Sequence, residues 1–139
     1  MTRLLSFRLS SQLCAVDVND VLEILPPKTP RSVPKAPSAL LGLLSYRDAP
    51  IPAIDPKSTL GLPAVEPTAE AATLVLKTSE GPLALVADSI LDVREVATSR
   101  LAPPPLTMPK LARKLIQFVI PEEKELMFVL RPEQVANVN

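Results

Sequence analysis

The residues of this sequence best suited to specific chemistry are Arg47 and Asp48, a charged pair inside an otherwise apolar and proline-rich stretch, residues 40–55. A guanidinium group can form two parallel hydrogen bonds with one carboxylate, so Arg47 is able to bind an acidic side chain of a partner protein. It is equally able to pair within its own fold, with Asp48, Asp55 or Glu23. The stretch therefore indicates either a binding residue or an internal ion pair.

Catalytic chemistry has few candidate groups in this chain. There is no histidine, one cysteine and three glycines, which excludes Ser-His and Cys-His catalysis, histidine-metal sites and a glycine-rich phosphate loop. Two carboxylate pairs remain, Asp17 with Asp20 and Asp88 with Asp92, and either could hold a hard cation or act in acid-base chemistry. Neither has the ligand density of a calcium loop, so a helix cap and solvated faces are the favoured explanations. We expect no enzymatic activity, no cofactor and no metal.

Composition also limits the class of partner. Lysine plus arginine equals aspartate plus glutamate at 15 each, and aromatic residues make up only 3%. Nucleic acids and anionic membranes require a basic surface, which this balance does not favour. Cys14 lies in an apolar run, so we expect a buried thiol and a reducing compartment, the cytoplasm. No apolar segment has the length of a secretory signal or a membrane span, so we expect a soluble protein that is not inserted into a membrane.

The N-terminal part of the chain predicts a hairpin followed by a helix. Alternating apolar and polar residues indicate a strand at 5–9, and the run 13–16 can form its returning partner. Asp17 is suited to cap a short helix, because apolar residues follow at the spacing of one helical face until the prolines at 26 and 27 end it.

The predicted helix leaves the orientation of its apolar residues open. Helical spacing makes Val21 and Leu25 candidates for the core. Leu22 or Ile24 could instead face outward beside Glu23. Core packing is the favoured interpretation for each of them.

Short strands must position the Arg47 region. The run 40–44 predicts a buried strand in which Gly42 marks a bend or the close approach of another backbone. Residues 51–54 predict the next strand, which should lie at a sheet edge or be bulged, because its prolines cannot donate ladder hydrogen bonds. Arg47 and Asp48 thus occupy the turn between the two strands.

The rest of the chain predicts a second series of strands joined by surface connections. We expect strands at 73–77, 83–86, 90–96, 115–120 and 126–130, a short helix beginning near Pro132, and extended connections without ladder hydrogen bonds at 26–37, 57–71 and 103–109. Because no long amphipathic crossover helices separate the strands, the pattern favours small β-barrels over an α/β architecture.

Several of these segments together resemble the CheW family of chemotaxis coupling proteins. The resemblance lies in residues 7–9, 16–18 and 21–24, in Leu41-Gly42-Leu43-Leu44-Ser45-Tyr46-Arg47 and Ile51-Pro52-Ala53-Ile54-Asp55, and in residues 60–62, 83–88, 90–93 and 126–130. Their order and spacing agree with the family over nearly the whole chain, which makes the combination specific.

The resemblance implies a mainly β fold, in which two five-stranded SH3-like β-barrel subdomains pack around a shared apolar core with short helices. We expect residues 1–139 to form a single CheW-like domain. The first barrel would be built mainly from about 13–70, and the second mainly from about 71–130 with the terminal segments.

The implied function is that of a non-enzymatic adaptor between a CheA-type histidine kinase and the cytoplasmic tip of chemoreceptors. Arg47 matches the arginine associated with the receptor-facing surface, and Val21 and Glu23 match the region that helps form it. Gly42 and Pro52 match framework positions. Apolar strand faces of the first barrel would contact the regulatory domain of the kinase.

Two positions of the candidate partner surface depart from the family pattern. Asp48 stands where the family usually has glycine, and Ser45 where asparagine is common. Asp48 implies a different turn or a tolerated left-handed residue, and it places a carboxylate beside Arg47 that would neutralise the receptor-facing charge. Either change would alter the choice of partner.

These departures and the many prolines keep other functions open. A divergent CheW-like scaffold could serve a non-motility chemosensory pathway that controls surface behaviour or second-messenger production. An OB-like nucleic-acid-binding barrel would need a basic groove with exposed aromatic rings, which the composition opposes. An enzyme would need a site built from carboxylates alone in a deep pocket.

Overall fold

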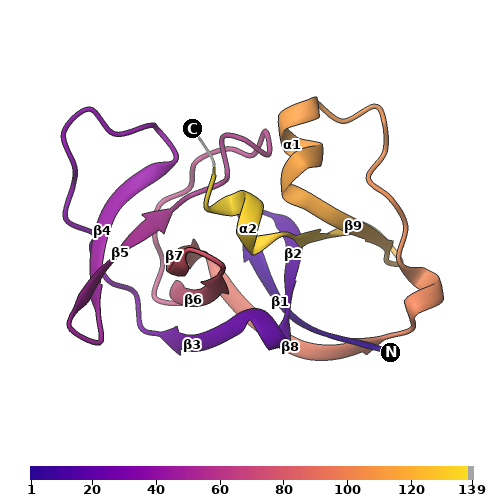
Figure 1. Cartoon of the computed structure of the whole chain (residues 1–139). Coiled ribbons are helices and arrows are strands. Elements are labelled where there is room, and N and C mark those ends of the chain that lie inside the picture. Colours follow the sequence, from indigo (N-terminus) through magenta and orange to yellow (C-terminus); the bar gives the residue numbers. More distant parts are fainter. Residues whose placement is uncertain (138–139) are drawn as a thin grey trace.

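The computed structural model describes residues 1–137, which form two five-stranded sheets with a few short helices (Figure 1). The first sheet has the strand order β8 (Ser89–Val96), β1 (Thr2–Leu9), β2 (Gln12–Asp17), β10 (Leu126–Leu130) and β9 (Ile116–Pro121). The second has the order β3 (Val21–Leu25), β6 (Ala72–Thr78), β7 (Gly81–Ala87), β5 (Ala49–Ile54) and β4 (Leu40–Tyr46). This arrangement confirms the mainly β prediction. It is consistent with SH3-like barrels, although among the described residues backbone pairing does not close either sheet into a ring.

The two sheets do not divide the chain where the sequence suggested. Strands β3 to β7 all belong to the second sheet, and β8 to β10 rejoin β1 and β2 in the first. The assignment of 13–70 to one barrel and 71–130 to the other is therefore wrong for β2, β6 and β7. The reason is that β6 pairs with β3 while β7 pairs with β5, so this hairpin fills the centre of the second sheet.

A shared core joins the two sheets, as expected. Its largest apolar cluster takes Phe7 and Val16 from the first sheet and Leu74 and Leu85 from the second. Buried aliphatic and aromatic side chains of this size each contribute about 1.5–3 kcal/mol. Ser6, one of the polar residues of the alternating pattern in β1, is also fully buried, because both faces of this strand are covered by apolar clusters.

The helix predicted after Asp17 is wrong. One 3-10 turn, Val18–Asp20, leads directly into β3, and Asp17 caps that turn by accepting a hydrogen bond of 2.8 Å from the backbone N–H of Asn19. The spacing of the apolar residues fits a strand as well, because alternate residues of β3 face the core. The strand forms because β6 offers it a pairing edge along its length.

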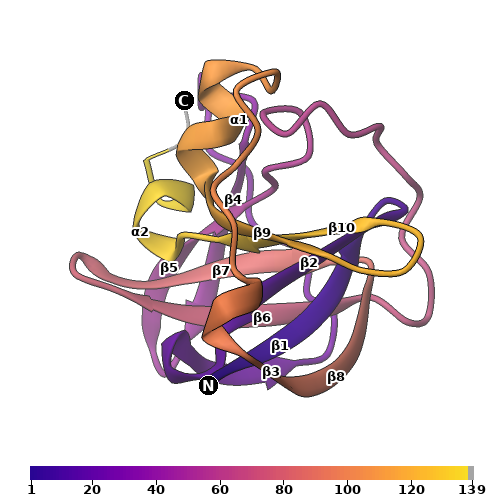
Figure 2. The same ribbon diagram turned by 90° about the vertical axis from the view of Figure 1, so that its right-hand side faces the viewer.

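Helix α1 (Lys110–Leu115) is not predicted by the sequence, whereas α2 (Pro132–Val135) agrees with the prediction and has Pro132 in its first turn. Figure 2 shows α1 leading directly into β9, with α2 beside it. Six residues after a run of prolines are too few to give a helical period. Within the described residues no helix combines the length and the apolar character needed to cross a membrane.

The connection at 26–37 is held at one point to the edge of the second sheet. Arg31 and Leu43 exchange two backbone hydrogen bonds of 2.8 Å each, so the expectation that this segment makes no ladder bonds is wrong there. Gly42 makes this approach possible, because a Cβ at this residue would lie 2.2 Å from the carbonyl oxygen of Arg31. The predicted role of Gly42 is confirmed.

Strand β5 is not an edge strand, because it pairs with β4 on one side and, at Ala53 and Ile54, with β7 on the other. The pairing with β4 is irregular near Gly42, which agrees with the bulged alternative. Pro50 and Pro52 lie opposite Ser45 and Leu43. Leu43 directs its N–H and C=O away from β5, so both prolines occupy non-hydrogen-bonded positions and remove no bond from this ladder.

Candidate functional site

The turn between β4 and β5 consists of Arg47 and Asp48, as predicted. Both have left-handed backbone conformations, with φ of 49° and 65°, between the paired residues Tyr46 and Ala49. A two-residue turn of this kind matches the twist of a hairpin and normally selects glycine, asparagine or aspartate. Asp48 is thus a left-handed residue in place of glycine, and Arg47 is held in a conformation that costs about 1–2 kcal/mol. The turn places the Arg47 side chain at the tip of the hairpin.

Arg47 forms its ion pair with Glu23, one of the three internal partners considered. The Nη2 atom of Arg47 lies 3.3 Å from Oε1 of Glu23, and the guanidinium carbon lies 5.2 Å from the centre of the Tyr46 ring. The Tyr46 hydroxyl donates to the same Glu23 oxygen at 3.2 Å. The Arg47 side chain is nevertheless 75% exposed. A single exposed ion pair contributes at most about 1 kcal/mol, so the guanidinium remains available to another carboxylate.

The contact between Glu23 and Arg47 joins the two outer strands of the second sheet, since Glu23 lies on β3 and Arg47 follows β4. The sheet therefore curves far enough for its edges to meet through side chains. Partial desolvation raises the pKa of the Tyr46 phenol, Arg47 opposes this shift, and the hydrogen bond to Glu23 adds to it. The phenol thus stays a proton donor to Glu23.

A hollow of about 450 Å³ lies beside Arg47. It is lined by Leu22, Tyr46, Arg47, Ala49, Pro50, Ile51, Pro52, Glu80 and Pro82. Leu22 and Ile24 are 45% and 47% exposed, so the favoured core packing is wrong for both, and both face outward because they are alternate residues on the outer face of β3. An apolar floor with a cation and a carboxylate at its rim is suited to an apolar side chain of a partner flanked by polar groups.

Ser45 and Asp48 lie in a second hollow of about 550 Å³, together with Lys28, Thr29, Arg31, Leu43, Leu44, Ala49 and Pro50. Asp48 makes no ion pair with Arg47 within residues 1–137, so the expected neutralisation of Arg47 by its neighbour is wrong. The carboxylate that pairs with Arg47 is that of Glu23. Val21 lies at neither hollow, because it is half-buried against the main core and opposite Leu76. The structure thus pairs Arg47 with Glu23, places Ser45 and Asp48 in the adjoining hollow, and leaves Val21 outside both.

Three residues of these two hollows, Tyr46, Lys28 and Arg31, were not predicted from the sequence. Tyr46 precedes Arg47 directly, and an aromatic residue beside an exposed arginine is a usable signal for a cation–π contact. Lys28 and Arg31 carry no such local signal. Their position depends on the fold-back of the 26–37 segment onto Gly42, a contact that no periodic pattern in the sequence indicates.

The carboxylate pairs considered for catalysis have structural partners. Asp17 caps a turn. Desolvation raises the pKa of Asp20, and the nearby charge of Asp17 raises it further. Asp88 accepts bonds from the Ser10 N–H at 2.5 Å and from Nζ of the buried Lys57 at 3.2 Å. No group of three or more histidine, cysteine, aspartate or glutamate side chains suited to a metal occurs in residues 1–137.

The single thiol is equally inert. Cys14 is completely buried, as predicted, and burial raises its pKa far above the ordinary value. Only the thiolate form of cysteine is a good nucleophile. Cys14 therefore packs in the core shared by the two sheets, and its thiol is not activated as a nucleophile.

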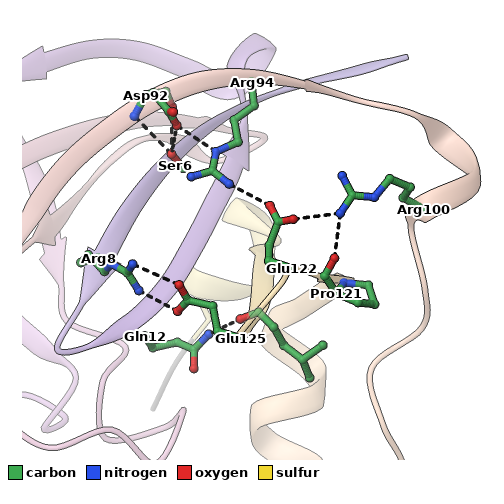
Figure 3. A network of polar contacts seen from close by, with 10 residues as sticks. Ser6, Arg8, Gln12, Asp92, Arg94, Arg100, Pro121, Glu122 and Glu125 are labelled. Carbon is green, nitrogen blue, oxygen red and sulfur yellow. Dashed lines mark hydrogen bonds and ion pairs between the residues drawn. The ribbon is translucent and has the colours of Figure 1, made fainter.

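Asp92 belongs to a polar network that bridges the outer strands of the first sheet (Figure 3). Ser6 donates to Asp92 at 2.5 Å, and Arg94 on β8 contacts both Asp92 at 2.9 Å and Glu122, which follows β9, at 2.8 Å. Arg100 binds the second oxygen of Glu122 at 2.8 Å. Each carboxylate is thus compensated by a cation. The network ties β8 to the β9–β10 turn and closes the open side of the sheet.

A second ion pair in the same region is bidentate. Arg8 donates to the two carboxylate oxygens of Glu125 at 2.7 and 3.1 Å, which lowers the pKa of Glu125. The bonds from Ser6 and then Arg94 lower the pKa of Asp92. Both carboxylates are ionised acceptors within a brace between strands, and neither has the raised pKa expected of a general acid.

Comparison with known proteins agrees with this architecture. The sequence matches the family model of the CheW-like domain over residues 3–139. It is 28% identical over 134 residues to the chemotaxis protein CheW of Rhizobium meliloti, covering 95% of this chain and 85% of that protein. It is 25% identical over 130 residues to the probable chemotaxis protein CheW of Rhizobium etli, covering 94% and 84%.

A solved structure shares the fold. The crystal structure of the scaffolding protein TtCheW from Thermoanaerobacter tengcongensis superposes with a TM-score of 0.89 at 18% sequence identity, covering 99% of this chain and 89% of that chain. At this identity the likeness concerns the fold.

Proposed function

The chain belongs to the CheW family, whose domain spans residues 3–139, and on this premise we propose that it is a non-enzymatic adaptor of chemosensory signalling. It couples a CheA-type histidine kinase, through the regulatory domain of that kinase, to the cytoplasmic tip of a chemoreceptor. An adaptor of this kind fixes the relative position of its partners. It biases the kinase between active and inactive arrangements by binding one of them more tightly, for which a modest difference in affinity suffices.

The observation that carries the proposal is the presentation of Arg47. Its guanidinium is held at the tip of a rigid two-residue turn, beside an apolar hollow, by one exposed carboxylate and one aromatic ring. A partner carboxylate can replace Glu23 without burying an unpaired charge, while an apolar side chain of the receptor fills the hollow over Leu22. This combination of an apolar centre and a charged rim supports specific docking.

The kinase is assigned to the apolar edges of the second sheet. Strands β3 and β4 are the outer strands, and they carry Ile24 and Leu41, which are 47% and 37% exposed. Exposed apolar side chains on edge strands favour contact with another β domain. Ile24 and Leu41 are not among the residues that line the hollow beside Arg47, so receptor and kinase would contact different residues.

Substitution of Arg47 tests the receptor surface. We expect Arg47→Glu to weaken binding of a receptor cytoplasmic fragment by about tenfold or more, because it places a like charge beside Glu23 and removes the donor. Isothermal titration calorimetry measures the affinity, and circular dichroism verifies the fold. Binding of the kinase regulatory domain should change by less than twofold.

Arg3→Glu is the matched control, because Arg3 is an exposed arginine that pairs with a glutamate, Glu95, on the first sheet. It should leave receptor affinity unchanged. Unaltered receptor affinity of a natively folded Arg47→Glu variant would refute the assignment. If that variant unfolds, Arg47→Gln removes the charge without introducing a repulsion and gives the same test.

The divergent turn favours one alternative within the same family. Asp48 keeps the left-handed conformation of the family glycine but adds a carboxylate to the second hollow. The added charge would alter which receptor is bound, so the alternative proposal is a receptor of a non-motility chemosensory pathway. Copurification of the tagged protein from its host, followed by mass spectrometry, identifies which receptor and kinase are bound.

A further inference from the structure

The outer edge of β4 carries a pair of backbone groups without a partner. Leu43 directs its N–H and C=O to this edge, where both bond to Arg31. Alternate residues of a strand direct these groups to the same side, so Ser45 also directs its N–H and C=O outward. Within residues 1–137 neither group of Ser45 makes a hydrogen bond, and the residue is exposed. An unpaired strand edge of this kind is a template for another strand.

The segment that could cover Ser45 turns away from it. In the antiparallel register set by Arg31 and Leu43, Thr29 would lie opposite Ser45, but the pairing is confined to the single bridge. The result is the hollow of about 550 Å³, whose lining includes Lys28, Thr29, Arg31, Leu43, Ser45 and Asp48. The gap thus lies beside the unpaired groups of Ser45.

The charges around this hollow select the side chains of an incoming segment. Lys28 and Arg31 are exposed, and neither makes an ion pair in the part of the chain that the structure describes. Asp48 is the one carboxylate in the lining. The backbone of Arg31 is fixed by its two hydrogen bonds to Leu43, in the space that Gly42 leaves free. The Arg31 side chain therefore projects from a fixed backbone position. Two cations on a fixed rim favour carboxylates, and Asp48 disfavours them at the turn end of the hollow.

We propose that this hollow is the docking site of an extended acidic segment of a partner protein, which adds to β4 as a further strand. Its backbone pairs with Ser45, and its carboxylates bind Lys28 and Arg31. Backbone pairing supplies affinity, while the charges at alternate positions set register and specificity. The site adjoins the hollow beside Arg47, with which it shares Ala49 and Pro50, but Lys28, Arg31 and Ser45 line this hollow alone. Its test requires neither kinase nor receptor, so its failure is distinguishable from failure of the adaptor function.

Nuclear magnetic resonance of the isotopically labelled full chain tests the proposal with a synthetic peptide that alternates glutamate and valine. We expect saturating peptide to slow hydrogen exchange of the Ser45 amide by about tenfold or more, because the amide gains a partner. The same peptide with alternate backbone N–H groups methylated should lose this protection. A peptide with lysine in place of glutamate should not bind.

Charge-reversal variants test the rim. Lys28→Glu and Arg31→Glu should each weaken binding of the glutamate peptide by about tenfold, which corresponds to the loss of one charge-assisted contact. Lys35→Glu is the matched control, since Lys35 is an exposed lysine of the same segment outside the hollow, and it should change affinity by less than twofold. The Arg31 bridge uses backbone atoms only, so circular dichroism should show a native fold.

Three results would overturn the proposal: equal affinity for the glutamate and lysine peptides, a Ser45 amide that stays unprotected at saturation, or resonance shifts confined to the Arg47 hollow. If Arg31→Glu loses its fold, Lys28→Glu decides alone, because Lys28 makes no hydrogen bond in the described residues.

Discussion

At the scale of the residue, the proposed receptor surface depends on two left-handed residues at the tip of one hairpin. The sequence locates Arg47 and Asp48 in a turn, because a polar pair interrupts two apolar runs. It does not reveal that Arg47 pairs with Glu23, since this contact depends on two outer strands meeting through the curvature of a sheet. Local patterns report the turn, and only the tertiary fold selects its partner.

Replacement of Asp48 by glycine should stabilise the protein. Asp48 has φ of 65°, which glycine adopts without a steric cost, so we expect Asp48→Gly to raise the free energy of unfolding by roughly 0.5–1 kcal/mol. Urea denaturation measures the change. Glu80→Gly is the control, because Glu80 is an exposed acidic turn residue without a positive φ and should gain nothing. A less stable Asp48→Gly variant would contradict this view of the turn.

At the scale of the element, the sequence predicted nearly every strand but mistook β3 for a helix. Over five residues, the spacing of apolar residues fits both one face of a helix and a strand whose alternate side chains face outward. The segment Val21–Leu25 is therefore too short to distinguish the two periods. The neighbouring strand β6 decided the outcome. Helix α1 escaped prediction for the same reason, since a segment of six residues is too short for its burial pattern to show.

Gly42 is the element-scale position with the sharpest expectation. A Cβ there would meet the Arg31 carbonyl oxygen at 2.2 Å, so we expect Gly42→Ala to destabilise the protein by about 3 kcal/mol and to release the 26–37 segment. Gly61→Ala separates the two causes, because Gly61 also has a positive φ but a Cβ added to it would meet no atom within 4 Å, and about 1 kcal/mol is expected. Equal losses in the two variants would show that the close approach to Arg31 is unimportant.

The polar brace of the first sheet makes a prediction about acid. The pKa values of Asp92 and Glu125 are lower than in the unfolded chain, so both carboxylates stabilise the fold above their unfolded pKa values, and this contribution is lost as the pH falls through the folded values. We expect the free energy of unfolding to decline in this acidic range. The decline should be shallower in Asp92→Asn, which starts from a lower stability at neutral pH.

Urea denaturation at a series of pH values measures this dependence. Glu123→Gln is the control, because Glu123 is an exposed carboxylate of the β9–β10 turn and makes no ion pair in residues 1–137. A wild-type protein whose stability does not fall with acid, or an Asp92→Asn variant with an unchanged slope, would show that the brace contributes nothing.

At the scale of the whole molecule, two sheets share one core, and each is closed across its outer strands by an arginine–glutamate contact. Arg94 and Glu122 do this in the first sheet, and Arg47 and Glu23 in the second. Short strands without crossover helices predicted small β-barrels, and the resemblance to the CheW family implied two five-stranded units. The boundary predicted between them is wrong, since the pairing of β6–β7 with β3 and β5 is set by contacts distant along the chain.

The adaptor role requires that kinase and receptor bind at the same time through different surfaces. Sedimentation velocity of this protein with a kinase regulatory domain and a receptor cytoplasmic fragment tests this requirement most directly. We predict one complex that contains all three proteins, and loss of the receptor alone from that complex in Arg47→Glu. Mutually exclusive binding of the two partners, or loss of both in the variant, would contradict the adaptor role.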